Sequence, residues 1–116
     1  MARILIIDDD LDIRILLRTV LEHEGYDIIE AANGAEGLQQ YQAIPPDLVI
    51  TDLQMPVMDG LELLQVLRHV APTPTVVALS GDQHMLAQAQ RLTPYAFTKP
   101  VPLEQLRAAV LTLVPP

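Results

Sequence analysis

Residues 48–60 read LVITDLQMPVMDG, and this stretch decides the fold. Its first residues are apolar or β-branched, which is typical of a strand buried on both faces of a parallel sheet. The run ends at the carboxylate of Asp52, and the following loop contains Pro56, which fixes φ, and Gly60, which can adopt a positive φ. Asp59 is placed to cap the next helix. Because ligands bind at the carboxyl ends of strands in open α/β sheets, we interpret Asp52 as a functional residue.

The bulk composition indicates one domain over residues 1–116, since this length is close to the commonest domain size. The sequence has no Cys, so we expect neither disulfides nor thiolate chemistry. The apolar run at the amino terminus is too short for a signal peptide, and none is long enough to span a bilayer. We therefore expect a cytoplasmic location and no membrane contact.

The charge balance is strongly acidic, with 15 acidic residues, 7 basic residues and a net charge of −8. Such a surface repels phosphate backbones and anionic lipids, so we expect no direct contact with nucleic acid. A divalent cation or a basic partner suits this surface better. Lys99 is the only lysine in the chain.

The rest of the chain repeats one unit, a short apolar strand followed by a helix. The predicted strands are 3–8, 26–30, 47–51, 75–79 and 96–98. Apolar residues at helical spacing predict helices between and after them, of which the third runs to about residue 70 and the fourth to about residue 92. Right-handed crossovers then give an α/β fold, a doubly wound (βα)5 five-stranded parallel sheet with helices on both faces.

Polar side chains follow four of the predicted strands: Asp8 and Asp9, Asp52, Ser80 and Lys99. The carboxyl ends of parallel strands meet at one edge of a sheet, so we expect these residues to gather there. If the first strand lies beside the third, Asp9 faces Asp52. Three carboxylates in one cleft need a counter-charge, which Mg2+ and the Lys99 ammonium can supply.

This set of residues favours phosphoryl transfer. A carboxylate can attack phosphorus to give an acyl phosphate. Positive charge from Mg2+ and Lys99 would stabilise the transferring group, and the rotatable hydroxyl of Ser80 could donate to one of its oxygens.

Four segments in this order resemble the receiver domain of two-component response regulators, the CheY-like family, and the resemblance covers the whole chain. The segments are Ile6–Asp9, Thr51–Gly60, Ala78–Gly81 and Thr98–Pro100. The resemblance implies a flavodoxin/CheY-like sheet with the strand order 2-1-3-4-5.

The resemblance also implies roles for these residues. Asp52 would accept a phosphoryl group from the phosphohistidine of a sensor histidine kinase or a phosphotransfer protein. Lys99 would pair with that group, and Ser80 would move toward it. The bond between Lys99 and Pro100 is expected to be cis.

For the metal, the resemblance implies a Mg2+ site built from Asp8, Asp9, Asp52 and Gln54. Asp9 would bind the ion through its carboxylate, and Asp8 would bind mainly through water. Gln54 would contribute its backbone carbonyl, so its side chain is not constrained.

The sequence departs from the family in two places. Receivers usually carry an aromatic residue three positions before the lysine, where this chain has Ala96. Tyr95 and Phe97 flank it, but adjacent strand residues point to opposite faces, so neither is an automatic substitute. The segment from Ser80 to Lys99 is also about one helical turn shorter than usual, which predicts a short fourth helix and an unusual output mechanism.

Other functional classes fit less well. An aspartyl-nucleophile phosphatase of the haloacid-dehalogenase type would use an Asp-x-Asp pair after its first strand, but Asp12 stands where that family has Thr or Val. An EF-hand fails because Ile13 occupies the position that needs Gly. Asp10 and Asp12 are interpreted as helix caps and solvated helix-start charges and not as metal ligands. A receiver-like interaction module that acts without phosphate is the alternative that stays open.

The sequence thus predicts a phosphoacceptor switch and not a metabolic enzyme. It would catalyse only its own phosphorylation and slow dephosphorylation and would change the surface of its fourth helix, fifth strand and fifth helix. The domain would act alone on a downstream protein or be the front of a longer regulator with a fused output domain, as a monomer or a weak dimer.

Overall fold

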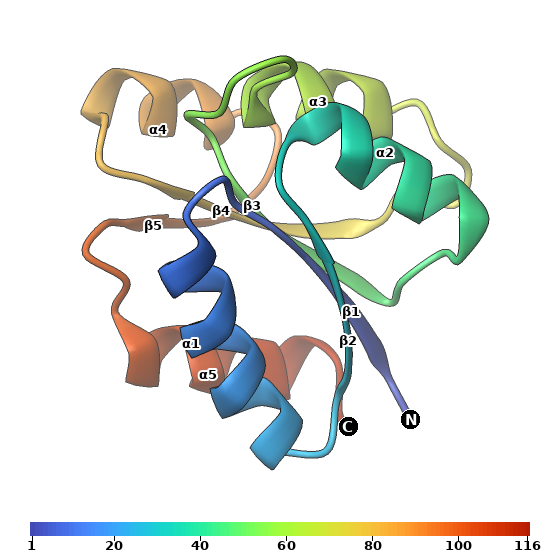
Figure 1. The fold of residues 1–116 in the computed structure, drawn as a ribbon. Helices are drawn as coiled ribbons and strands as arrows, with labels where there is room; N and C mark the ends of the chain where they lie inside the picture. Colours follow the sequence, from blue (N-terminus) through green and yellow to red (C-terminus); the bar gives the residue numbers. More distant parts are fainter.

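Five parallel strands form a single sheet in the computed structural model, which describes residues 1–116 (Figure 1). The strands are β1 (Arg3–Ile7), β2 (Asp27–Ala31), β3 (Leu48–Asp52), β4 (Thr75–Ser80) and β5 (Tyr95–Thr98). Their order in the sheet is β2-β1-β3-β4-β5, and every neighbouring pair is parallel. The expected fold class and strand order are confirmed.

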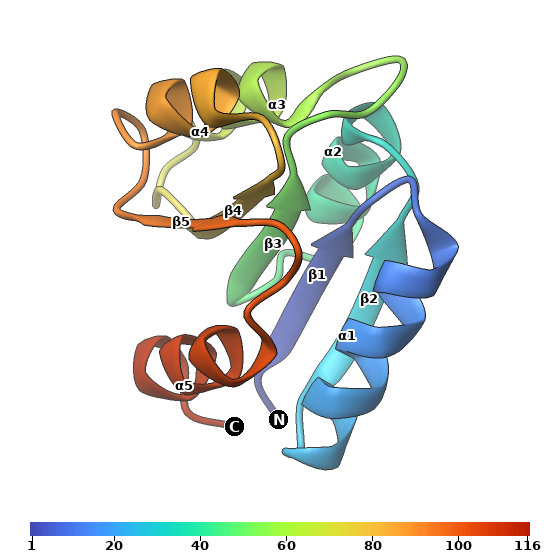
Figure 2. The same ribbon diagram turned by 90° about the vertical axis from the view of Figure 1, so that its left-hand side faces the viewer.

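A helix follows each strand, so the sheet is covered on both faces. The helices are α1 (Leu11–His23), α2 (Gly34–Ala43), α3 (Gly60–Leu67), α4 (Gln83–Ala89) and α5 (Leu103–Leu113). α1 and α5 lie on one face, and α2, α3 and α4 lie on the other, as Figures 1 and 2 show. None of the helices is long and apolar enough to cross a membrane.

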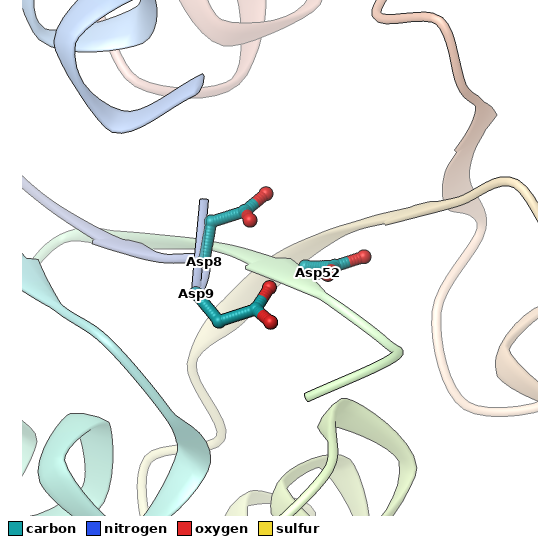
Figure 3. Close-up of side chains that lie close together, drawn as sticks. All are labelled: Asp8, Asp9 and Asp52. Atoms are coloured by element: carbon teal, nitrogen blue, oxygen red, sulfur yellow. The ribbon is translucent and has the colours of Figure 1, made fainter. Parts of the chain in front are cut away.

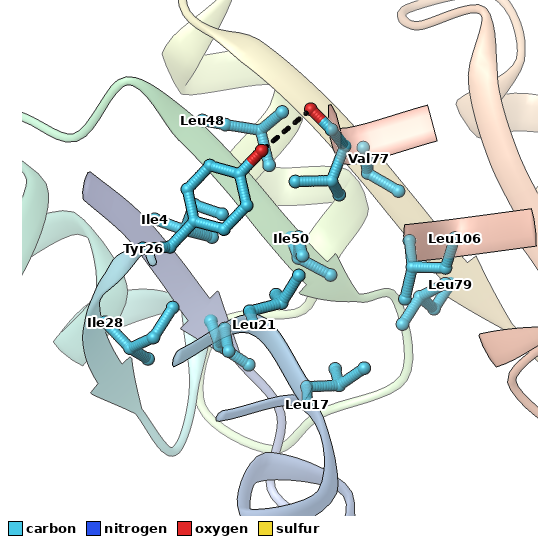
Figure 4. Packing of buried hydrophobic residues seen from close by; sticks show 12 residues of the cluster. Ile4, Leu17, Leu21, Tyr26, Ile28, Leu48, Ile50, Val77, Leu79 and Leu106 are labelled. Atoms are coloured by element: carbon cyan, nitrogen blue, oxygen red, sulfur yellow. Dashed lines mark hydrogen bonds between the residues drawn. The ribbon is translucent and has the colours of Figure 1, made fainter. Parts of the chain in front are cut away.

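The core consists of two apolar clusters, one on each face of the sheet. Along β1, Ile4 and Ile6 belong to the cluster under α1 and α5, whereas Leu5 and Ile7 belong to the cluster under α2, α3 and α4. This alternation explains why the central strands are continuously apolar in sequence. In the first cluster the buried Tyr26 hydroxyl donates to the backbone carbonyls of Val110 in α5 and of the C-cap Val114, which ties the residue before β2 to the end of that helix (Figure 4).

The helix starts follow the predicted caps. The Asp10 carboxylate accepts from the Asp12 amide at 2.9 Å, and the Asp59 carboxylate accepts from the Glu62 amide at 2.8 Å. These contacts confirm Asp10 and Asp59 as capping residues.

Two helix ends differ from the prediction. α3 ends at Leu67 and not near residue 70, and α4 ends at Ala89 and not near residue 92. The extra residues form tight turns instead, with Val70 N donating to Leu67 O at 3.1 Å and Leu92 N to Ala89 O at 2.9 Å. Prolines follow shortly after both turns and prevent the helices from continuing.

Candidate functional site

The predicted functional residues lie at the carboxyl edge of the sheet. Asp52 and Ser80 are the last residues of β3 and β4, while Asp8 and Lys99 directly follow β1 and β5. β1 pairs with β3, which places Asp8 and Asp9 beside Asp52. Figure 3 shows the three side chains close together, with their carboxyl groups directed to the same side of the view.

The three carboxylates form a cluster suited to a hard cation. One oxygen from each of Asp8, Asp9 and Asp52 lies within 4.8 Å of the others. Asp8 and Asp52 are buried, whereas Asp9 is exposed. Mg2+ holds oxygens at about 2.1 Å, so that ligands on opposite sides of the ion are about 4.2 Å apart. Donor chemistry and spacing therefore both fit a Mg2+ ion, with Asp9 on the solvent side.

Lys99 supplies the one positive charge in contact with this cluster. Its Nζ lies 3.0 Å from Asp8 Oδ2 and 3.4 Å from Asp52 Oδ1. Partial burial by itself would lower the pKa of Lys99. The hydrogen bond to Asp8 and the charge of Asp52 outweigh this effect and raise that pKa. Lys99 is therefore fully protonated at neutral pH.

Asp52 has an unusually high pKa of about 6 in the metal-free protein. Burial is the main cause, and the negative charge of Asp8 adds to it. Lys99 and a hydrogen bond from the Gln54 backbone oppose the rise without cancelling it. The surroundings of Asp52 thus disfavour its ionised form. Additional positive charge beside it would stabilise that form.

Ser80 is fully buried, but its hydroxyl does not contact the carboxylate cluster. The Oγ accepts a hydrogen bond from Asp82 N at 2.9 Å and lies 3.4 Å from Asp82 O. The Asp82 carboxylate in turn accepts from the amides of His84 and Met85 and caps α4. Ser80 therefore lies at the carboxyl edge of the sheet, and its hydroxyl is hydrogen-bonded to the turn that starts α4.

Arg14 is a residue of the site that the sequence analysis missed. Its Nη1 donates to the backbone carbonyl of Asp8 at 2.6 Å, and its Nε donates to the Glu30 carboxylate at 3.1 Å. The guanidinium thus fixes the turn that holds Asp8 and Asp9. A basic residue in the first turns of a helix that follows an acidic strand end is the signal that could have found it.

The β3–α3 loop explains the role of Gly60. Its φ is not positive, but an added Cβ would lie 2.3 Å from Asp52 O and 2.8 Å from Leu53 Cα. Gly60 is needed because the backbone that carries Asp52 passes so close. The positive φ in this loop, 70°, belongs to Val57.

The side chains of β5 divide between the two faces of the sheet. Ala96 packs in the cluster under α4, whereas Tyr95 and Phe97 pack in the cluster under α5. Both aromatic neighbours of Ala96 therefore lie on the opposite face of the sheet, as the alternation along the strand predicted. The predicted cis bond between Lys99 and Pro100 is also confirmed.

Comparisons with known proteins agree in both sequence and structure. The model of the response regulator receiver domain family matches residues 4–111. Sporulation initiation phosphotransferase F of Bacillus subtilis is 35% identical over 97% of this chain and 94% of its own. The chemotaxis protein CheY of Thermotoga maritima is 32% identical over 75% of each chain.

Among solved structures, the response regulator TrrA of Thermotoga maritima, in complex with Mg2+ and BeF, superposes with a TM-score of 0.90. It is 32% identical, and the match covers 98% of this chain and 100% of that one. A response regulator receiver domain protein of Clostridium thermocellum superposes with a TM-score of 0.87 at 29% identity, over 97% and 94% of the two chains.

Proposed function

The chain belongs to the response regulator receiver domain family, the phosphoacceptor module of two-component signalling, and from this membership we propose that Asp52 is the residue that accepts the phosphoryl group. The observation that carries the proposal is the position of its buried carboxylate, 3.4 Å from Lys99 Nζ and within 4.8 Å of Asp8 and Asp9. Receiver domains are phosphoacceptor switches and not conventional enzymes, and they take phosphoryl groups from histidine kinases or phosphotransfer proteins. Residues 1–116 act here as one receiver domain.

In the proposed reaction, an Asp52 oxygen attacks the phosphorus of a phosphohistidine. An O–P bond forms as the N–P bond breaks, and the imidazole leaves with the electron pair and takes up a proton. The Asp52 carboxylate becomes an acyl phosphate, which water later hydrolyses. The receiver residues thus catalyse their own phosphorylation and the later hydrolysis of the acyl phosphate.

The surrounding residues would hold the group in place. Asp8, Asp9, Asp52 and the Gln54 backbone would hold Mg2+, which supplies positive charge to the phosphoryl oxygens when it is bound. Lys99 already contacts Asp52, so its ammonium needs only a small movement to bind an arriving phosphoryl oxygen.

Ser80 would complete the response by breaking its hydrogen bonds with Asp82. Its hydroxyl now donates to the Asp82 carbonyl at 3.4 Å, so it can donate to a phosphoryl oxygen only if it rotates away from that carbonyl. Since Asp82 caps α4, this movement would loosen the start of that helix and alter the α4–β5–α5 surface. Ala96 offers no aromatic ring to follow the movement, so we assign the response to the turn between β4 and α4.

Intact mass after incubation with acetyl phosphate tests the proposal. The wild type should gain one phosphoryl group with Mg2+ and none with EDTA, while Asp52→Ala should gain none. Asp12→Asn, which changes an exposed acidic residue of α1, is the matched control and should behave as wild type. A folded wild-type protein that gains no phosphoryl group would favour the phosphate-independent interaction module instead.

A further inference from the structure

The charges are unevenly divided along the chain. Residues 1–62 carry thirteen acidic and three basic residues, a net charge of −10. Residues 63–103 carry one acidic residue, Asp82, against Arg68, Arg91 and Lys99, a net charge of +2. This second stretch supplies most of α3 and all of β4, α4 and β5. Lys99 pairs with Asp8 and Asp52 at the carboxyl edge, and α3 also contains Glu62, so the side of the molecule covered by α3 and α4 is nearly neutral in an otherwise acidic protein.

Two basic side chains in this region have no carboxylate partner. The five basic residues that form ion pairs are Arg3, Arg14, Arg18, Lys99 and Arg107. Arg68 and Arg91 form none, and neither guanidinium donates a hydrogen bond to another protein group. Both side chains are exposed. Their charges are therefore available to an external ligand.

Arg68 and Arg91 line the same open pocket. It has a volume of about 360 Å³ and lies between α3 and α4, which are neighbours on one face of the sheet (Figures 1 and 2). Its other lining residues are Leu61, Gln65, Gln88 and Leu92. The pocket thus combines two guanidinium groups, two amides and two apolar side chains, and no carboxylate.

A simpler reading is that both arginines serve their own helices. Arg68 is the C-cap of α3, and Arg91 follows the C-cap of α4. Cations at these positions interact favourably with the helix dipole. This reading explains a basic residue at each helix end. It does not explain why both are unpaired at one concave surface from which acidic residues are missing, and it predicts an effect on stability but none on binding.

We propose that the pocket between α3 and α4 is a docking site for an acidic segment of a partner protein. Carboxylates of the segment pair with Arg68 and Arg91, and an apolar side chain between them packs on Leu61 and Leu92. Charge complementarity selects this occupant, because the rest of the surface repels an acidic chain and thereby directs it to this pocket. A nucleic acid is excluded because its backbone would also place phosphates along the acidic surface outside the pocket, whereas a short acidic segment need only enter the pocket.

Fluorescence anisotropy with the unphosphorylated protein at low ionic strength tests the proposal. The probe is a short fluorescein-labelled peptide in which Glu residues flank Leu, and the same peptide with Gln in place of Glu is its control. The Glu peptide should bind and the Gln peptide should not. Arg68→Ala and Arg91→Ala should each weaken binding about threefold, and the Arg68→Glu, Arg91→Glu double variant should abolish it.

A charge-reversal variant elsewhere separates the pocket from overall charge. Arg3→Glu also exchanges an arginine for a glutamate, but at β1, and should retain wild-type binding. The proposal would be overturned if Arg3→Glu weakened binding as much as the double variant does, or if the Gln peptide bound as tightly as the Glu peptide. It would also be overturned if free acetate or phosphate competed at low concentration, or if the Glu peptide did not bind at all. Circular dichroism of each variant establishes that it is folded. None of these measurements involves Asp52, so the result is independent of the phosphoacceptor assignment.

Discussion

Lys99 determines the electrostatics of the carboxylate cluster at the scale of single residues. It contacts both buried carboxylates, whose side chains are 2% and 6% exposed. One ammonium cannot balance Asp8, Asp9 and Asp52 together, so the cluster keeps a net negative charge. Burial is the main cause of the high pKa of Asp52, the residual negative charge adds to it, and the same charge leaves the site ready for a cation.

The pKa of Asp52 predicts how stability depends on pH in the metal-free protein. Folding raises this pKa from 3.8 to about 6, so the folded state holds the proton more tightly than the unfolded chain. Stability from this group is present below about pH 4 and is lost as the pH rises through about 6, at a cost on the order of 3 kcal/mol. In EDTA, Asp52→Asn should therefore be more stable than wild type at pH 7 and similar at pH 4.

Urea denaturation at the two pH values measures this difference. Asp12→Asn, which alters an exposed carboxylate, should track the wild type at both. If the Asp52→Asn advantage were the same at pH 4 and pH 7, burial of the charged carboxylate would not be its cause.

Val57 is strained, because its φ of 70° places a β-branched residue in the left-handed region. Its side chain is 79% exposed, so removing it loses little packing. Val57→Gly should raise the free energy of unfolding by about 0.5–1 kcal/mol, as relief of strain exceeds the added entropy of the unfolded chain. Val66→Gly, within α3, should lower it by about 1 kcal/mol. If thermal denaturation showed that both substitutions change the stability in the same direction, Val57 would not be strained.

At the scale of elements, the β3–α3 loop and the β4–α4 turn surround the carboxylate cluster and differ in how tightly they pack. The first lies directly on the backbone of Asp52, since Gly60 has no room for a Cβ. The second has space around Gly81, where the nearest atom to an added Cβ is 4.0 Å away. The tight loop holds Asp52, the proposed phosphoacceptor, in place, and the looser turn carries Ser80, which must move in the proposed response.

Matched substitutions test this contrast. Gly60→Ala should destabilise the protein by about 2–3 kcal/mol and slow phosphorylation by acetyl phosphate, because Asp52 must shift to make room. Gly81→Ala should change stability by less than about 1 kcal/mol. Urea denaturation and intact mass measure the two effects. A Gly60→Ala protein with wild-type stability and phosphorylation rate would show that the close approach does not constrain Asp52.

For the whole molecule, folding gathers three carboxylates in a chain that already carries a net charge of −8. A ligand that binds only the folded state stabilises it, by about 1.4 kcal/mol when its concentration is tenfold above its dissociation constant. Mg2+ should therefore raise the melting temperature of the wild type. Asp9→Asn should reduce the effect with little cost to folding, because Asp9 is exposed.

Differential scanning fluorimetry measures this shift, with NaCl at equal ionic strength as the control for general screening. Equal shifts from Mg2+ and NaCl would contradict a specific site. An Asp9→Asn shift as large as that of the wild type would remove Asp9 from the proposed ligands.

The amino-acid sequence by itself determined the fold class and the residues of the carboxylate cluster with its lysine. The buried strands are continuous apolar runs, the helices have regular spacing and caps, and the polar residues Asp8, Asp52 and Lys99 directly follow strands. Each of these signals is local, so it can be read without knowing which distant residues meet. The parallel arrangement then brings the strand ends to one edge.

Only the tertiary structure decided which partners these residues have. It placed the Ser80 hydroxyl on Asp82, the Arg14 guanidinium behind Asp8, and Arg68 with Arg91 in one pocket. Two of these contacts depend on how neighbouring helices and turns pack, and the third on which hydrogen bond a rotatable hydroxyl makes. Residue spacing specifies a strand or a helix, but the three-dimensional packing of side chains selects among the contacts that the spacing allows.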